Sequence, residues 1–307
     1  MRIALPELVL GGAGYAGLYR AVAPETATAT LRAAWDGGVR AFDTAPHYGA
    51  GMSEERLGAF LAAHPRDEFV LSTKIGRLLY DDRDALDGTD GFFGTPARSR
   101  RRDYTGSGTR RSLEDSLQRL DLDRIDVALI HDPDDHQEQA LAGAVPELTR
   151  MREEGTVTGI GVGVNDADLA LRFVRECDLD CVLIAGRYTL LDSRASGLLD
   201  ECLRRDIEVM VAGVFNSGLL ADPTERDTFD YRSAAPEIVA RARKMADACA
   251  EYGVSIRAAA LQFPLRHPAV GSLVSGAATA AEVHDTIAQL AITIPDELWK
   301  RLDEVAA

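Results

Sequence analysis

The chain has 307 residues, a formal net charge of −15 and 46% hydrophobic residues. That composition supports a large buried core and excludes wholesale disorder. The negative charge argues against nucleic-acid binding, because such proteins need a clustered basic surface, and the basic stretch at 97–104 is flanked by acidic segments. No apolar run approaches the roughly 18 residues of a membrane span, and the N-terminus does not have the pattern of a signal peptide. We therefore expect no nucleic-acid or membrane partner.

The cysteines carry no metal or disulfide pattern. Cys177, Cys181, Cys202 and Cys249 include no Cys-x-x-Cys pair and have no histidine at ligand spacing. This usage indicates reduced, packed thiols in a cytoplasmic protein.

Short apolar runs alternate along the chain with amphipathic helical patterns. The runs are continuously apolar, as in strands buried on both faces of a parallel sheet. Eight such βα units predict a closed (β/α)8 TIM barrel, one domain over residues 1–307, whereas a doubly wound open sheet usually has fewer strands. The expected strands are 7–12, 39–44, 69–74, 125–131, 159–164, 180–185, 207–213 and 270–276, and the expected helices are 24–38, one from 53, 107–120, 137–154, 166–176, 195–205 and 235–263.

The stretch 76–107 breaks this alternation. It follows the third strand, has no sustained periodicity, and is rich in glycine, aspartate and arginine. Loops of this length in compact domains are usually functional lids or disordered segments. In a barrel this long loop would lie on the catalytic rim.

Residues 12–17 spell the dinucleotide fingerprint Gly-x-Gly-x-x-Gly. A Rossmann site also needs a helix opening at the third glycine and an acidic residue at a strand end about 20 positions on. Here Pro24 interrupts the helix, and Asp36 precedes two glycines at a helix end. The glycines more plausibly keep the first loop small, so that a bulky group can approach the barrel mouth.

Three polar residues end consecutive predicted strands: Asp43, Lys74 and His131, with Tyr48 in the loop after Asp43. Each alone has an ordinary structural explanation. Side chains at the carboxyl ends of barrel strands share one mouth, so together they indicate a site. A cation beside a tyrosine favours the phenoxide and should lower its pKa from about 10. Lys74 would supply the charge, Asp43 would hold it, and His131 would orient a substrate oxygen for carbonyl/alcohol interconversion.

These residues resemble the Asp–Tyr–Lys–His tetrad of the aldo-keto reductase superfamily. "FDTAPHYG", "STKIG" and "IHDPDD" match in order, and so do residues 111–134 and the ending "IPDELWKRLDEV". The resemblance implies a nicotinamide cofactor lying across the barrel mouth. It implies cofactor contacts from Gly12, Ala13, Asp43, Asn165, Phe215, Asn216, Gly218, Gly276, Thr279, Glu282 and Asp285.

Glu282 stands where NADP-preferring members carry arginine, and Gly276 where they carry lysine. A carboxylate would repel a 2′-phosphate and accept a ribose hydroxyl. This departure implies NAD as the preferred cofactor, with NADP possible; Glu282 has the alternative of being a solvated first-turn residue.

Within the superfamily the chain resembles the branch of aldose 1-dehydrogenases and pyridoxal 4-dehydrogenase. The resemblance implies oxidation of a cyclic hemiacetal, such as L-fucose, D-arabinose or L-galactose, at C1 to a lactone. Pyridoxal oxidation and general aldehyde or ketone reduction remain alternatives, as do a metal-dependent hydrolase using residues 131–136, a Schiff-base aldolase using Lys74, and a non-catalytic cofactor-sensing subunit.

Overall fold

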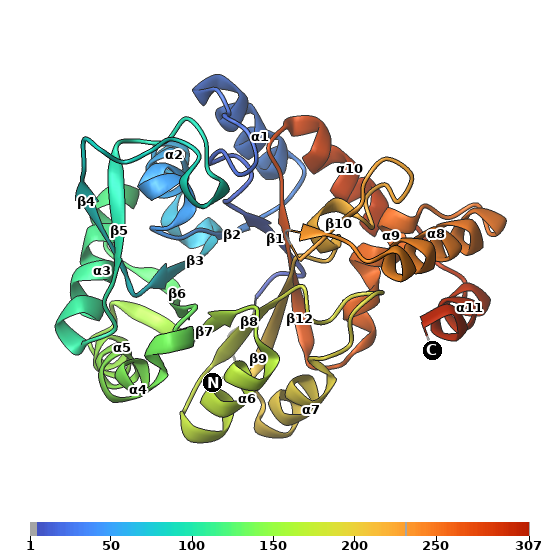
Figure 1. The fold of residues 1–307 in the computed structure, drawn as a ribbon. Coiled ribbons are helices and arrows are strands. Elements are labelled where there is room, and N and C mark those ends of the chain that lie inside the picture. The colour runs from blue at the N-terminus through green and yellow to red at the C-terminus, as the bar shows by residue number, and fades with distance from the viewer. Residues whose placement is uncertain (1–4, 231, 307) are drawn as a thin grey trace.

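The computed structural model describes residues 5–230 and 232–306, and its centre is a closed parallel barrel (Figure 1). Each neighbouring pair is parallel, and β1 closes the barrel by pairing with both β2 and β12. The predicted barrel and all eight predicted strands are confirmed. In spatial order the strands are β1 (Leu8–Gly11), β12 (Val270–Gly276), β9 (Glu208–Ala212), β8 (Cys181–Ala185), β7 (Val157–Val164), β6 (Ile125–His131), β3 (Val70–Ile75) and β2 (Ala41–Asp43).

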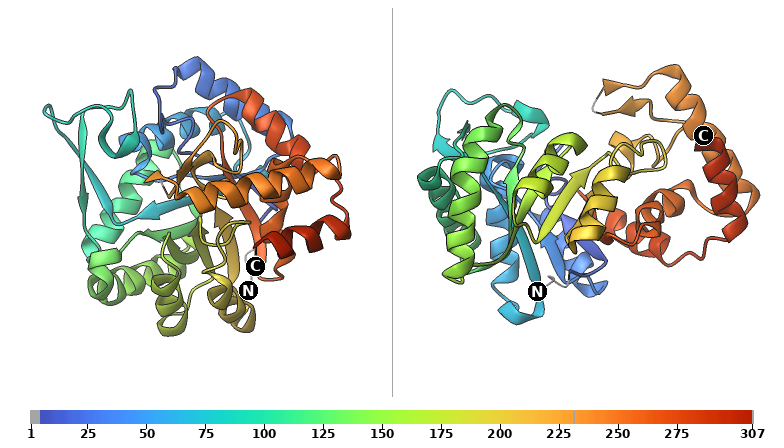
Figure 2. Two further views of the ribbon diagram at one scale, coloured as in Figure 1. Left: turned by 45° about the vertical axis from the view of Figure 1, so that its right-hand side comes forward. Right: turned by 90° about the horizontal axis from the view of Figure 1, so that it is seen from below.

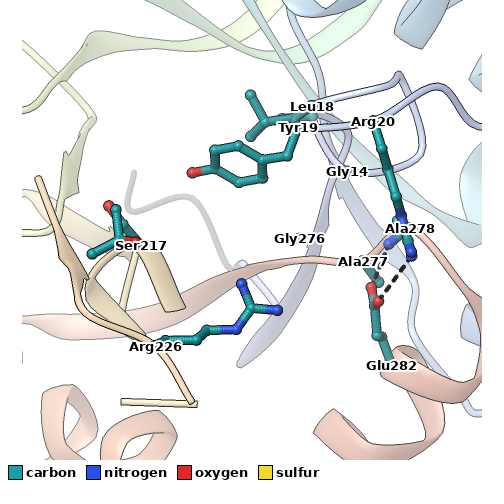
Figure 3. A pocket seen from close by; sticks show the side chains of 12 residues that line it. Gly14, Leu18, Tyr19, Arg20, Ser217, Arg226, Gly276, Ala277, Ala278 and Glu282 are labelled. Atoms are coloured by element: carbon teal, nitrogen blue, oxygen red, sulfur yellow. Dashed lines mark hydrogen bonds and ion pairs between the residues drawn. The ribbon is translucent and has the colours of Figure 1, made fainter. Parts of the chain in front are cut away.

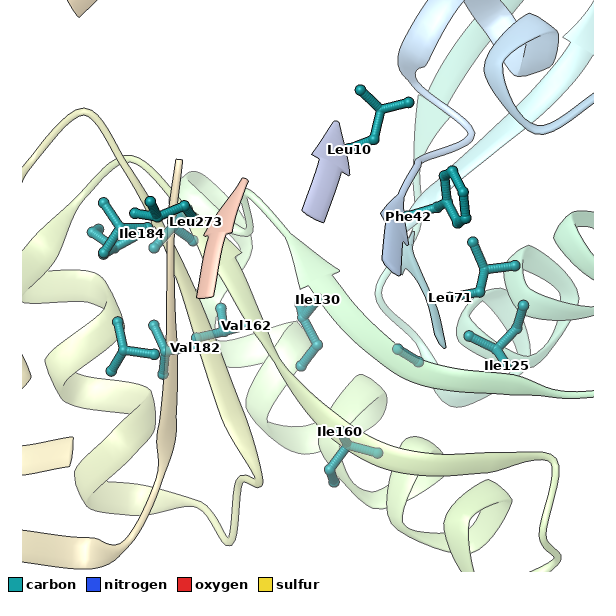
Figure 4. Close-up of a cluster of buried hydrophobic side chains, with 14 of the residues drawn as sticks. Leu10, Phe42, Leu71, Ile125, Ile130, Ile160, Val162, Val182, Ile184 and Leu273 are labelled. Atoms are coloured by element: carbon teal, nitrogen blue, oxygen red, sulfur yellow. The ribbon is translucent and has the colours of Figure 1, made fainter. Parts of the chain in front are cut away.

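Two apolar layers hold the barrel together, one between strands and helices and one inside the barrel. Strand β6 shows the division, since Ala128 and Ile130 belong to the outer layer while Val127 and Leu129 belong to the inner one. Figure 4 shows part of the outer layer, with Leu10, Phe42 and Leu71 side by side on three strands. Because side chains alternate along a strand, the residue after Ile130, His131, returns to the interior.

Helices surround the barrel (Figures 1 and 2). The predicted single helix at 235–263 is wrong: it is two helices, because Gly253 takes a positive φ of 67° and Ser255 caps a new helix through the Arg257 N–H. The helices are α1 (Pro24–Asp36), α2 (Met52–Leu61), α3 (Gly106–Leu120), α4 (Gln137–Gln139), α5 (Val145–Glu153), α6 (Ala167–Glu176), α7 (Ser196–Arg205), α8 (Pro236–Glu251), α9 (Ile256–Gln262), α10 (Ala280–Leu290) and α11 (Asp296–Ala306).

The long stretch after the third strand has its own structure. Strands β4 (Arg77–Asp81) and β5 (Arg98–Arg102) pair antiparallel, so the expectation of an irregular loop is corrected to a hairpin. Strand β5 carries arginine at every position except Ser99, so its sequence has no apolar alternation that would predict a strand. A shorter hairpin, β10 (Thr228–Phe229) and β11 (Arg232–Ser233), follows β9. Both hairpins connect a strand to a helix, so both stand at the carboxyl-end rim of the barrel, apart from each other (Figure 2).

All four cysteines are free. Among residues 5–230 and 232–306, none of the helices is both long and apolar enough to cross a bilayer.

Candidate active site

Strand alternation places Asp43 and Lys74 inside the barrel as a buried ion pair. Their neighbours Phe42, Leu71 and Ile75 pack outward. Lys74 Nζ donates to Asp43 Oδ2 at 2.7 Å and to the Thr44 carbonyl at 3.0 Å, and both charged side chains are at most 2% exposed. Burial opposes the lysine charge, but Asp43 and then Tyr48 outweigh it and raise the pKa of Lys74. Lys74 is therefore a fixed cation at neutral pH.

Tyr48 reaches this pair from the loop after β2. It opens a short 3-10 turn, Tyr48–Gly51, in which Gly49 has a φ of 60° and a Cβ there would lie 2.6 Å from the Ala16 carbonyl oxygen. Lys74 Nζ lies 4.6 Å from the centroid of the Tyr48 ring. The predicted neighbourhood of tyrosine, lysine and aspartate is thus present in the fold.

The predicted acidity of the phenol is wrong for the protein by itself. Burial raises the pKa of Tyr48 to about 12, and the charge of Lys74 and its hydrogen bonding to the phenol only partly offset that increase. The cation favours the phenoxide, but desolvation of the phenoxide opposes it and is the larger effect here. Tyr48 is therefore a protonated phenol at neutral pH.

His131 ends β6 beside the tyrosine, with the two ring centroids 5.8 Å apart. Burial, then the charges of Arg77 and Lys74, lowers the pKa of His131 well below its usual value, so the imidazole is neutral. Nε2 lies 3.4 Å from Asp132 Oδ2, and Nδ1 is buried without a partner among the described residues. Because a carboxylate only accepts hydrogen bonds, it favours the tautomer with the proton on Nε2.

Tyr48, Lys74 and His131 line one cavity of about 410 Å³. Asp43 lies beneath it and does not line it. The sequence reasoning missed His47, whose ring centroid is 5.7 Å from that of His131 and whose pKa is lowered to about 2 by burial and then by Arg77. Its position next to Tyr48 was the available signal. Other residues lining the cavity are Ala13, Leu18, Asp90, Phe92, Asp132, Gly163, Val164, Asn165, Leu183 and Ala185.

A second cavity, of about 560 Å³, adjoins the first, and Ala13 and Leu18 line both. Figure 3 shows Tyr19 and Arg20 on one side of it, Ser217 and Arg226 on another, and Glu282 rising from α10. Arg20 lies 3.6 Å from Glu282, both side chains being about half exposed or more, at 62% and 49%. We refer to the two adjoining cavities together as the cleft, the first being its catalytic half and the second its outer half. The remaining residues of its outer half are Gly14, Thr228, Gly276, Ala277 and Ala278.

The predicted cofactor residues divide into two groups. Ala13, Asn165, Gly276 and Glu282 line the cleft. The others do not line it. The Gly12 N–H donates to the Asp43 carbonyl, Asp43 pairs with Lys74, and Phe215 packs against the core. Gly218 lies against Arg226, Thr279 caps α10, and Asp285 pairs with Arg257.

Asn216 is the exception in that second group. It is buried beside Ser217, and both atoms of its amide lack a hydrogen-bond partner among the described residues. Since buried amide groups are nearly always bonded, Asn216 marks a place where a bound molecule would complete the structure.

The Gly-x-Gly-x-x-Gly motif lies in the first loop of the barrel and is not part of a Rossmann fold. No helix opens at Gly17, and α1 begins only at Pro24. Gly14 lines the outer half of the cleft, where a Cβ would lie 2.6 Å from the Ala277 carbonyl. The motif keeps the β1 loop against the β12 loop.

Two rival chemistries find no support in the geometry. Over residues 5–230 and 232–306, no three histidine, cysteine, aspartate or glutamate side chains come together as a metal-binding group. A Schiff-base lysine needs a neutral amine, whereas Lys74 is held as an ammonium by Asp43.

Comparisons with known proteins agree with this geometry. Residues 7–307 match the family model "Aldo/keto reductase family". The chain is 44% identical to D-threo-aldose 1-dehydrogenase from a Pseudomonas species and 38% identical to pyridoxal 4-dehydrogenase from Microbacterium luteolum, each over 98% of this chain and 94% of that protein. It is 28% identical to L-galactose dehydrogenase from Arabidopsis thaliana, over 91% of this chain and 82% of that one.

Solved structures show the same fold. Glycerol dehydrogenase from Gluconobacter oxydans superposes with a TM-score of 0.79 at 24% identity, covering 97% of this chain and 90% of that chain. The family model spans nearly the whole sequence. Tyr48, Lys74 and His131 of the expected tetrad line one cavity, and Asp43 pairs with Lys74 without lining it. The chain belongs to the aldo/keto reductase family of NAD(P)-dependent oxidoreductases acting on small molecules.

Proposed function

We propose that this enzyme oxidises the cyclic hemiacetal form of an aldose at C1 to a lactone, with NAD as the preferred cofactor. The observation that carries the proposal is the Tyr48–Lys74–Asp43 arrangement beside a neutral His131 in one cavity. The similarity to D-threo-aldose 1-dehydrogenase supports a sugar as the substrate.

The residues of this chain divide the work of the reaction. A bound oxidised nicotinamide supplies a hydride acceptor and a positive charge. Tyr48 receives the proton of the anomeric hydroxyl while C1 loses a hydride, so the hemiacetal loses two electrons and two hydrogens and becomes a lactone. Tyr48 first loses its own phenol proton to solvent, and Lys74, held by Asp43, stabilises the phenoxide that then receives the substrate proton. His131 donates a hydrogen bond from Nε2–H to the reacting oxygen, in place of its 3.4 Å contact with Asp132, and thereby orients that oxygen.

The cleft fits a dinucleotide on two grounds. Its two adjoining cavities, of about 560 and 410 Å³, share Ala13 and Leu18 in their walls and together offer room for an extended molecule. Asn216 does not line the cleft but precedes Ser217 of its wall, and its buried amide has no hydrogen-bond partner among the described residues. Arg226 offers a cation for a phosphate. We propose that Asn165 contacts the nicotinamide end and that Gly276 and Glu282 contact the adenosine end.

Glu282 is the basis for the proposed preference for NAD. Its Oε2 accepts a hydrogen bond from the Ala278 N–H at 2.7 Å, which holds the carboxylate at the cleft. A carboxylate there accepts a ribose hydroxyl and repels a 2′-phosphate. Arg20, 3.6 Å away, reduces that repulsion, which is why we propose that NADP is also used.

A substrate panel tests the proposal. L-fucose, D-arabinose, L-galactose and pyridoxal are each mixed with enzyme and NAD, and NADH absorbance is followed. We expect the largest kcat/KM with one of the aldoses. Turnover of pyridoxal alone would replace the proposal with the second candidate, which the 38% identity to pyridoxal 4-dehydrogenase favours. Turnover only of simple aldehydes in the reductive direction would indicate a general reductase.

We also propose that the enzyme is cytoplasmic. This proposal rests on its four cysteines, which are unpaired in the fold, with Cys181, Cys202 and Cys249 buried.

A further inference from the structure

Asp132 follows His131 directly and occupies a strained position at the mouth of the barrel. Its φ is +43°, in the left-handed region that aspartate enters only at a cost. Its N–H donates to the Gly163 carbonyl at 3.1 Å, and the Tyr104 hydroxyl donates to its carbonyl at 2.9 Å. These contacts hold the backbone so that the side chain lines the catalytic cavity.

The two oxygens of the Asp132 carboxylate have different surroundings. Oδ2 accepts a hydrogen bond from Arg77 at 2.9 Å and lies 3.4 Å from His131 Nε2. Oδ1 has no hydrogen-bond partner among residues 5–230 and 232–306, while the side chain is 24% exposed. The ion pair with Arg77 thus fixes the carboxylate and leaves one oxygen available.

We propose that Asp132 binds the hydroxyl on C2 of the substrate, the carbon next to the reacting one. The proposal deepens the proposed function and rests on it. If His131 Nε2 binds the reacting oxygen, that oxygen lies one hydrogen-bond length from Nε2. Nε2 itself lies 3.4 Å from Asp132 Oδ2. Oxygens on adjacent carbons lie about one hydrogen-bond length apart, so the C2 hydroxyl comes within reach of Asp132. A carboxylate accepts such a hydroxyl and gains more from it than a neutral acceptor does.

The other acidic residue of the cavity is less suited to this role. Asp90 is 50% exposed, lies 3.6 Å from Arg100 and 3.9 Å from His47, and comes from the β4–β5 connection. The structure records no contact between Asp90 and His131. Asp132 is thus the acidic residue of the cavity that lies beside His131 Nε2, the atom proposed to bind the reacting oxygen.

The test compares two sugars that differ only at C2, D-arabinose and 2-deoxy-D-ribose. In Asp132→Asn, an asparagine keeps the left-handed backbone and an acceptor for Arg77. We expect kcat/KM to fall about tenfold more with D-arabinose than with 2-deoxy-D-ribose, because a charged acceptor is replaced by a neutral one. A merely structural role for Asp132 predicts equal losses with both sugars, and that result would overturn the proposal.

Three controls keep the test decisive. Asp134→Asn removes a carboxylate from the same loop but outside the cavity and should leave the ratio of the two sugars unchanged. If Asp132→Asn does not fold, Arg77→Gln/Asp132→Asn leaves no buried guanidinium without its carboxylate and should show the same loss of discrimination. Calorimetry with the two corresponding lactones measures binding without hydride transfer. Asp132→Asn should weaken binding of the D-arabinose lactone about tenfold more than binding of the 2-deoxy lactone. Equal affinities of the wild-type enzyme for the two lactones would contradict the proposal.

A last pair of substrates separates this proposal from the proposed function. If the wild-type enzyme oxidises neither these two sugars nor L-fucose and L-galactose, the aldose proposal fails. Reduction of glycolaldehyde against acetaldehyde then tests Asp132 alone, because these aldehydes also differ by one hydroxyl on C2. Loss of that preference in Asp132→Asn supports the assignment, and an unchanged preference overturns it.

Discussion

The two halves of the cleft are built in different ways. The catalytic half takes its charges from strand ends inside the barrel, where Lys74 and Asp43 are 1% and 2% exposed. The outer half takes them from loops and a helix start, where Arg20 and Glu282 are 62% and 49% exposed. A charge buried in the barrel needs its partner, because removing one leaves the other uncompensated. A charge on the rim can change at little cost to stability, so the outer half is where cofactor choice can vary.

The largest expected effect is in the catalytic half. Tyr48→Phe should lower kcat/KM by about 10³-fold or more, because it removes the group that exchanges the substrate proton. Cofactor affinity, measured by quenching of protein fluorescence, should stay within about threefold, since the phenol contributes mainly to the proton step. Tyr252→Phe, at an exposed helix end, is the matched control. Retention of most of the rate in Tyr48→Phe would refute the mechanism.

The second prediction sharpens the contrast between buried and exposed ion pairs. Asp43→Ala should destabilise the fold by about 3–5 kcal/mol, because Lys74 remains buried without its counterion. Arg20→Ala should cost less than about 1 kcal/mol, as exposed pairs usually do. Denaturant unfolding of both variants measures the difference. Similar values for the two would show that the halves do not differ in this way.

The third prediction concerns pH. Only the deprotonated phenol accepts a proton, and burial holds the pKa of Tyr48 near 12. The reactive fraction, and with it kcat/KM for aldose oxidation, should therefore rise about tenfold per pH unit from pH 6 upward until the pKa of the loaded enzyme is reached. The positive charge of a bound nicotinamide lowers the pKa of the phenol, so the rise in kcat/KM ends at a lower pH, but kcat/KM still increases with pH. A profile that falls over this range would exclude Tyr48 as the base.

The smallest expected effect lies in the outer half. Glu282→Lys should shift the ratio of kcat/KM for NADP over NAD about tenfold towards NADP, because it replaces repulsion of a 2′-phosphate with attraction. Glu297→Lys adds the same charge on the exposed start of α11 and should leave the ratio unchanged. If the unaltered enzyme already prefers NADP strongly, the role proposed for Glu282 is wrong.

The catalytic half was accessible to sequence reasoning because its geometry follows from periodicity. Asp43, Lys74 and His131 end apolar strands, and parallel strands place such ends at one mouth. The β4–β5 hairpin was not accessible, because the nearly continuous arginines of Arg98–Arg102 give β5 no apolar alternation. Asp132 and His47 were missed although each adjoins a tetrad residue; their positions depend on backbone angles and on Arg77, which the chain order does not reveal.

By itself the sequence determined the eight strands, the barrel and the three polar residues at strand ends, Asp43, Lys74 and His131, since all three depend on the order and period of apolar residues. The turn Tyr48–Gly51 then brings Tyr48 to them. Only the tertiary structure decided the protonation of the site and the residues along the cleft. Burial raises the pKa of Tyr48, in opposition to the charge of Lys74. Burial lowers the pKa of His131, in the same direction as the charges of Arg77 and Lys74. Contacts between loops far apart in the chain bring Arg20 to Glu282 and Arg77 to Asp132. The free energy of a charge depends on everything packed around it, and a linear pattern does not contain that sum.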